Sequence, residues 1–218
     1  MRMSIETIVN ILNAKRIGNR EAEIDWILTD SRSLCFPEET LFFALKTKRN
    51  DGHKYLSDLY ERGVRNFVVS ELPENMDHYE NTNFLQVPHP LKALQRLVEK
   101  YRLQFDVPVI GVTGSNGKTV VKEWLYQLLS PERIITRSPR SYNSQIGVPL
   151  SVWLMNDKTE LGIFEAGISE MGEMEALQSI IRPTVGILTN IGGAHQENFY
   201  STSEKCMEKL LLFKDCDV

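Results

Sequence analysis

The clearest hydrophobic pattern in the chain is a short apolar run that changes into a helical repeat. The run predicts a buried strand, and its apolar residues are Val107, Val109, Ile110 and Val112. The repeat predicts an amphipathic helix with one apolar face, formed by Val121, Trp124, Leu125, Leu128 and Leu129. A glycine-rich turn joins the two elements, and the rest of the chain is arranged around them.

Similar patterns predict elements on both sides of this segment. Ser4 can cap a first helix whose apolar residues are Ile5, Ile8, Val9 and Leu12. Strands are predicted at residues 24–28, 41–45 and 67–69, with a short helix that ends at Gly63 and a longer helix that begins at Pro90. Further strands are predicted at residues 134–135, 161–164 and 185–188. Strands that alternate with helices predict an α/β fold with parallel sheets.

Two domains fit this order of elements. We place their boundary near residue 105, which gives a small α/β domain over 1–105 and a partial parallel-sheet domain over 106–218. A chain of 218 residues is long enough for two small domains.

The turn between the predicted strand and helix has the composition of a phosphate-binding loop. Its residues are Gly114, Ser115, Asn116, Gly117, Lys118 and Thr119. Loop amides and a helix N-terminus attract phosphate, Lys118 can reach the terminal phosphates, and the Thr119 hydroxyl can bind Mg²⁺. The general motif has glycine where this chain has Val112, so an ordinary glycine-rich turn is the alternative. The flanking strand, the helix and the Gly-Lys-Thr triplet favour a nucleotide site.

Polar residues after two later strands extend this candidate site. Glu165 ends the strand 161–164, where a second oxygen ligand of Mg²⁺ belongs. His195 follows the strand 185–188, and a lone loop histidine is more often structural than a ligand. Ser201 and Glu204 form the capping-box start of a further predicted helix. Lys205 and Lys209 lie one turn apart on it, and periodicity alone predicts both to be solvated.

Composition and charge exclude several classes of protein. A net charge of −4 gives no electrostatic reason to expect nucleic acid as a partner. No apolar run is long enough to span a membrane, so we expect no membrane insertion. The three cysteines do not form a C-x-x-C pair, which argues against a disulfide scaffold and for a reducing, cytosolic location.

Taken together, these motifs resemble the Mur ligases, which are ATP-dependent amide-forming enzymes of cell-wall precursor synthesis. The resemblance rests on residues 113–119, on Glu165-Ala166-Gly167, and on Thr189-Asn190-Ile191 followed by His195. The first half agrees with the family's UDP-sugar-binding domain through three groups of residues: Asp30-Ser31-Arg32, the segment 41–46, and Asp51-Gly52-His53. Residues 120–123, and Asn143 followed by residues 146–149, are similar to the member that adds a dipeptide.

The resemblance implies a role for each of these residues. ATP would be held by residues 114–119, Asn143 and Asn190. One Mg²⁺ would be held by Thr119 and Glu165, and a second by His195 with a carbamoylated Lys209. The implied catalytic residues are Lys118, His195 and Lys209. The UDP-sugar substrate would contact Asp30, Ser31, Arg32, Lys46, Asp51, Gly52 and His53. The implied reaction joins D-alanyl-D-alanine to UDP-N-acetylmuramoyl-tripeptide through an acyl phosphate.

Three alternatives remain at this stage. A related ligase could add a different amino acid, because the residues that select it would lie in a C-terminal domain that is missing here. A fragment of this length could bind nucleotide or UDP-sugar without turnover, and the parent could be fused to an alanine racemase. A GTPase-like switch would need an N-K-x-D motif after a strand, which this sequence lacks.

Overall fold

In the computed structural model, which describes residues 2–47, 50–192 and 199–216, the chain divides into two compact units. They are Met1–Leu97 and Val98–Val218, a division a few residues before the boundary predicted near residue 105. Both units combine helices with largely parallel sheets, so the predicted α/β class is confirmed. No helix in the described part of the chain is long and apolar enough to cross a membrane.

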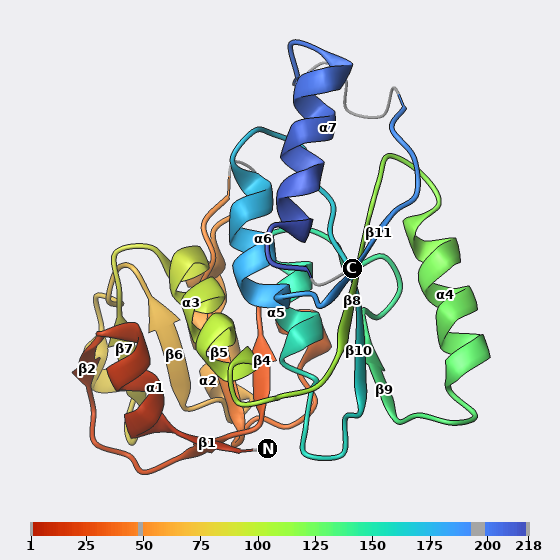
Figure 1. Cartoon of the computed structure of the whole chain (residues 1–218). Helices are drawn as coiled ribbons and strands as arrows, with labels where there is room; N and C mark the ends of the chain where they lie inside the picture. The colour runs from red at the N-terminus through yellow and green to blue at the C-terminus, as the bar shows by residue number, and fades with distance from the viewer. Residues whose placement is uncertain (1, 48–49, 193–198, 217–218) are drawn as a thin grey trace. The chain divides into compact units, whose positions relative to one another are not determined.

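The first unit is built on a five-stranded sheet with strand order β2-β7-β6-β5-β4 (Figure 1). β4 (Trp26–Leu28), β5 (Thr40–Phe43), β6 (Asn66–Val69) and β7 (Asn83–Gln86) are parallel, and β2 (Lys15–Ile17) is antiparallel to β7. A two-stranded ribbon pairs β1 (Met3–Ser4) with β3 (Glu23–Ile24). The strand predicted over residues 24–28 is therefore two strands in different sheets.

The helices of the first unit begin and end close to their sequence signals. α1 (Ile5–Leu12) is capped by the Ser4 side chain, which accepts a hydrogen bond from the Thr7 amide. α2 (Leu56–Glu61) is followed by Gly63 at a φ of 95°, as a C-terminal glycine requires. α3 (Pro90–Arg102) begins at its proline in the first unit and ends in the second, because the division falls between Leu97 and Val98. The described residues of this unit also form the 3₁₀ turns η1 (Ser31–Ser33), η2 (Gly52–Tyr55) and η3 (Met76–His78).

The second unit is a four-stranded parallel sheet with strand order β11-β8-β10-β9. Its strands are β8 (Val109–Thr113), β9 (Ile135–Arg137), β10 (Leu161–Glu165) and β11 (Val185–Leu188). α4 (Lys118–Leu129) covers one face, and Figure 1 shows α5 (Gly147–Val152) and α6 (Glu173–Ile181) on the other. α7 (Thr202–Leu210) and the turn η5 (Leu211–Phe213) follow, and η5 packs against α6 and the sheet.

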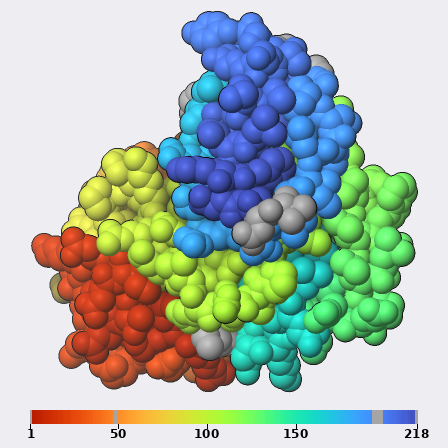
Figure 2. Space-filling view, viewed as in Figure 1, coloured from red at the N-terminus to blue at the C-terminus, as the bar shows by residue number. Residues whose placement is uncertain are grey.

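The apolar face predicted for α4 is wrong at two of its five positions. Val121, Leu125 and Leu129 pack against the sheet core. Trp124 and Leu128 are instead 62% and 74% exposed. Figure 2 shows α4, in green, at the surface of the molecule. Among the described residues, only α4 packs on this face of the sheet, and one narrow stripe of the helix is covered.

Candidate functional site

The glycine-rich loop forms a tight connection between β8 and α4. Gly114 has a φ of 141°, and a Cβ there would stand 2.0 Å from Thr189 Oγ1, so a larger residue does not fit. Gly117 has a φ of 82° and is the N-cap of α4, which no side chain caps. The first amides of an α-helix have no partner within the helix. The start of α4 is therefore available to an anion.

Residues at the end of β11 hold this loop in place. The Ser115 amide donates to Asn190 O at 2.9 Å, and the Asn116 amide donates to Asn190 Oδ1 at 3.0 Å. Thr189 Oγ1 donates to Asn116 O at 2.6 Å. Asn190, which we predicted to contact the nucleotide, lies beside the loop, and its contacts in this structure are with the loop backbone.

Two lysines contact this loop, and a third contacts Gly192, which is hydrogen-bonded to Ser115 of the loop. Lys118 Nζ donates to Gly114 O at 2.8 Å, Lys209 Nζ donates to the same oxygen at 3.3 Å, and Lys205 Nζ donates to Gly192 O at 2.6 Å. The prediction that Lys205 and Lys209 are solvated is wrong, since they are 2% and 3% exposed. The structure thus concentrates positive charge where phosphate would bind.

The packing of α7 explains why these lysines are buried. Glu208, which lies between them on the buried side of α7, accepts a hydrogen bond at 3.0 Å from the Met174 amide in the first turn of α6. A carboxylate is favourable at a helix N-terminus. This contact turns the face of α7 that carries Lys205 and Lys209 toward the interior.

The lysines also alter one another's acidity. Burial, followed by the charges of Lys118 and Lys205, lowers the pKa of Lys209 to about 8. Burial lowers the pKa of Lys118 as well; Glu165 opposes this change and Lys205 adds to it. Desolvation and neighbouring positive charge both disfavour an ammonium, so this cluster is poised to receive an anion.

Glu165 and Thr119 form a candidate site for a cation beside the loop. Thr119 Oγ1 donates to Glu165 Oε2 at 3.1 Å, and Asn143 Nδ2 lies 3.4 Å from the same oxygen. Two adjacent ligands of octahedral Mg²⁺, with bonds of ~2.1 Å, lie about 3.0 Å apart. Glu165 is fully buried, and its Oε1 accepts no hydrogen bond from the described residues but lies 3.0 Å from Lys122 Nζ. These oxygens fit Mg²⁺.

The second predicted metal site lies partly outside the described residues, because His195 falls in the segment 193–198. Among the residues that the structure describes, no group of three His, Cys, Asp or Glu side chains could hold a metal ion. The assignment of His195 and Lys209 to a second Mg²⁺ therefore stays a prediction.

The predicted substrate residues of the first unit lie beyond β4 and β5. Asp30 caps η1 and pairs with Arg32 at 2.6 Å, and this hydrogen-bonded pairing lowers the pKa of Asp30. Ser31 is buried, and its carbonyl accepts a hydrogen bond from Arg62 at 2.9 Å. The ends of neighbouring parallel strands lie at one edge of a sheet, where ligands commonly bind.

The second loop of this group is ordered by His53. Its Nε2 accepts a hydrogen bond at 3.1 Å from the Ser70 amide, so Nδ1 carries the proton and donates to Asp51 at 2.6 Å. Hydrogen bonds from the His53 amide and ring, together with the charge of Lys46, lower the pKa of Asp51. The Gly52 amide donates to Leu45 O at 2.8 Å, which returns the loop to the end of β5.

One residue of the site was missed by the sequence analysis. Lys122 is fully buried, and its Nζ lies 3.0 Å from Glu165 Oε1. Its position was the available signal: it lies one turn after Lys118, one turn before Leu125 and two turns before Leu129. Helical periodicity predicts that a lysine is exposed to solvent. Only the structure shows that the loop after β9 covers Lys122.

Comparisons with known proteins agree with this geometry. Residues 112–217 match the family model described as the Mur ligase middle domain. The UDP-N-acetylmuramoyl-tripeptide–D-alanyl-D-alanine ligase of Bacillus subtilis is 34% identical over 82% of this chain and 38% of its own length. The ligase of the same name from Borreliella burgdorferi is 32% identical over 96% of this chain and 47% of its own length.

Two solved structures extend the likeness to three dimensions. MurF from Acinetobacter baumannii matches with a TM-score of 0.90 and 26% identity, over 99% of this chain and 47% of that chain. MurF ligase from Thermotoga maritima in complex with ADP matches with a TM-score of 0.76 and 28% identity, over 88% of this chain and 43% of that chain. The chain thus spans less than half the length of each of these four relatives.

Proposed function

Because the chain belongs to the Mur ligase family, we propose that it binds ATP with Mg²⁺ at the loop 114–119. We propose that it acts as part of an ATP-dependent ligase of peptidoglycan precursor synthesis. The curated relatives named above support one member of the family, which joins D-alanyl-D-alanine to UDP-N-acetylmuramoyl-tripeptide. The complex of the Thermotoga maritima ligase with ADP supports an adenine nucleotide as the ligand.

In the proposed reaction, ATP phosphorylates the terminal carboxylate of the tripeptide, which gives an acyl phosphate and ADP. The amine of D-alanyl-D-alanine then attacks the acyl carbon and releases phosphate, so the bond to the amine replaces the bond to the phosphate oxygen. No covalent intermediate with the protein is needed. The protein's contribution is to position the reactants and to stabilise developing negative charge.

The site residues predicted from the sequence each have a place in this reaction. Lys118 and the first amides of α4 hold the phosphates, with Asn190 supporting the loop. Thr119 and Glu165 would hold Mg²⁺, which neutralises phosphate charge when it is bound. Asn143 would steady Glu165 from the other side. The predicted roles of His195 and of a carbamoylated Lys209 belong to the same proposal.

The first unit would hold the UDP-sugar end of the substrate. The loops that carry Asp30, Arg32, Lys46, Asp51 and His53 follow neighbouring parallel strands, and they present both signs of charge and several hydrogen-bonding groups. Contacts on loops that a rigid sheet supports are typical of ligand sites. We place the reaction in the cytosol, as the cysteine content predicts.

The observation that carries the proposal is a cluster of three lysines beside an uncapped helix start: Lys118 and Lys209 contact Gly114 of the loop, and Lys205 contacts the neighbouring Gly192. The test uses a full-length chain, meaning one extended to the length of the relatives, with ATP, Mg²⁺ and UDP-N-acetylmuramoyl-tripeptide. We expect phosphate release that depends on D-alanyl-D-alanine and the matching peptide product by mass spectrometry.

The same assay tests two alternatives: a related ligase that adds a different amino acid, and a protein that binds nucleotide without turnover. Release of phosphate with a single amino acid, but not with the dipeptide, would identify another ligase of the family. Nucleotide binding without phosphate release, with either acceptor, would identify a binding protein. Failure of ATP to bind at all would refute the proposed site.

A further inference from the structure

Lys122 is a buried cation that the proposed reaction does not use. Its side chain is fully buried, and its Nζ is surrounded by four oxygen atoms. It donates to Ser138 O at 2.7 Å and to Arg140 O, and it lies 3.0 Å from one carboxylate oxygen each of Glu123 and Glu165. A lysine is rarely buried unless it is paired, so this arrangement demands a reason.

Two independent periodicities bring Lys122 and Glu165 together. In β10, Leu161, Ile163 and Glu165 alternate onto the face that α4 covers. On α4, Lys122 lies one turn before Leu125 and near the other residues that pack on this face. The carboxylate at the end of the strand and the ammonium on the helix therefore meet just beside the phosphate loop.

The two oxygens of Glu165 have different surroundings. Oε1 lies against Lys122, whereas Oε2 accepts the hydrogen bond from Thr119 and lies 3.4 Å from Asn143 Nδ2. Mg²⁺ demands near-ideal octahedral geometry and is usually bound through one or two carboxylates. A carboxylate engaged on one side by a buried ammonium can offer a single oxygen in a fixed direction.

We propose that Lys122 is a positioning residue that holds Glu165 through Oε1, so that Oε2 is presented next to Thr119 as a ligand of Mg²⁺. This inference rests on the proposed nucleotide site and adds a residue to it. The same ammonium fixes the loop after β9 through Ser138 and Arg140. That loop carries Ser141, whose Oγ lies 3.1 Å from Thr119 Oγ1, so the lysine organises both sides of the site.

The test compares nucleotide binding by calorimetry in Mg²⁺ and in EDTA, using the full-length chain. Loss of a residue that orients a metal ligand typically weakens metal binding about 10- to 100-fold. In Mg²⁺, nucleotide should bind more tightly than in EDTA, and we expect Lys122→Met to reduce this gain in affinity about 10- to 100-fold. The ADP affinity of the variant in EDTA should stay within about twofold of the parent's. A lysine that is merely structural would change both affinities together.

A double variant tests whether Lys122 acts through Glu165. Glu165→Gln should lose the gain from Mg²⁺, and adding Lys122→Met to it should cost nothing further, because the partner has already been removed. Glu123→Gln is the matched control, since it removes the other carboxylate beside Lys122; we expect the gain from Mg²⁺ to persist. Additive losses in the double variant would overturn the proposal.

A second substitution guards against misfolding of the methionine variant. Lys122→Arg keeps the charge but moves it, because a planar guanidinium cannot occupy the position of a compact ammonium. If only this variant folds by circular dichroism, we expect a loss of at least about threefold in the gain from Mg²⁺, and an unchanged gain would overturn the proposal. Absence of ADP binding in EDTA by the parent chain would instead refute the nucleotide site itself.

Discussion

Substitution of Lys118 by alanine gives the most direct test of the phosphate loop. In the structure its ammonium is half-buried and rests on Gly114 O and Ser115 O, at 2.8 and 3.4 Å. It therefore lies directly over the loop that would hold the phosphates. A bound phosphate would exchange these carbonyl contacts for a charge-assisted hydrogen bond.

The size of the effect follows from that exchange. A hydrogen bond to a charged group contributes about 1.5–3 kcal/mol, and each ~1.4 kcal/mol is a tenfold change in affinity. Lys118→Ala should therefore weaken ATP binding about 10- to 150-fold. The burial that lowers the pKa of Lys118 favours the upper part of this range, because a desolvated phosphate finds no water to replace the lost partner.

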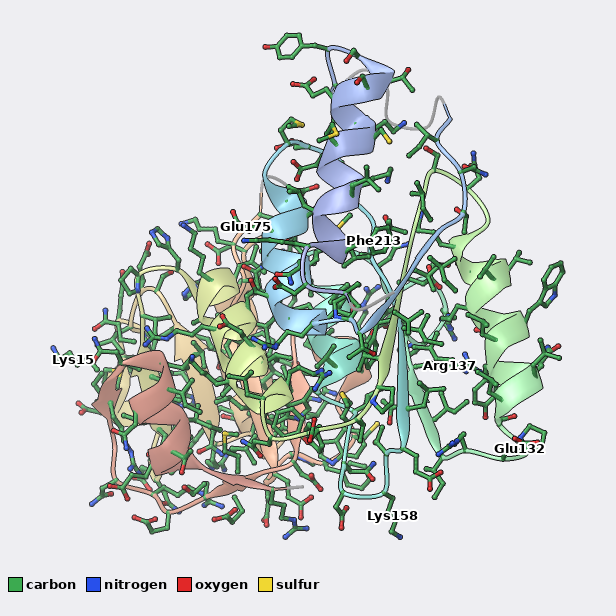
Figure 3. All side chains as sticks on the ribbon, viewed as in Figure 1. Lys15, Glu132, Arg137, Lys158, Glu175 and Phe213 are labelled. Carbon is green, nitrogen blue, oxygen red and sulfur yellow. The ribbon has the colours of Figure 1, made fainter. Side chains whose placement is uncertain are left out.

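The measurement is calorimetry of the full-length chain with ATP and Mg²⁺. Lys158→Ala is the matched control, since it removes the same charge from an exposed turn before β10, at the opposite end of the strands (Figure 3). We expect the control to bind ATP with the parent's affinity. Equal affinity in the Lys118 variant and the parent would refute the phosphate-loop assignment.

Three further predictions concern other parts of the chain. In an NMR titration with UDP-N-acetylmuramic acid, amides of residues 30–32 and 46–53 should shift, and two unshifted loops would count against the substrate site. The 218-residue chain alone should associate in size-exclusion chromatography, because Trp124 and Leu128 are exposed and β11 is an edge strand of the described sheet; elution as a monomer at every concentration tested would contradict this. Lys209→Ala should abolish activity in the full-length chain, with partial rescue by a short carboxylic acid, and near-normal activity would exclude a carbamate. At a pKa of about 8, roughly a tenth of Lys209 is neutral at pH 7, so carbamate detected by carbon-13 NMR should increase as the pH rises toward 9.

The sequence alone determined the local features of this protein. The loop 114–119, the Ser4 cap of α1 and the Ser201 cap of α7 depend on residues that are neighbours in the chain, and the structure places each of them as predicted. The parallel order of the strands also followed from their alternation with helices, because parallel strands need long crossovers. The position of Glu165 at the end of β10 followed from the same pattern.

The tertiary structure decided which faces of these elements are covered. Lys209 lies against Gly114, 95 residues earlier in the chain, and Glu208 binds an amide that lies 34 residues away. Lys122 is buried because the loop after β9 passes over it, and no periodicity in α4 encodes that loop. Spacing along a helix fixes which side chains share a face, but whether that face meets water or protein depends on segments distant in the sequence. Buried polar groups are affected most. Each needs a hydrogen-bonding or charged partner, and only the tertiary packing brings that partner close.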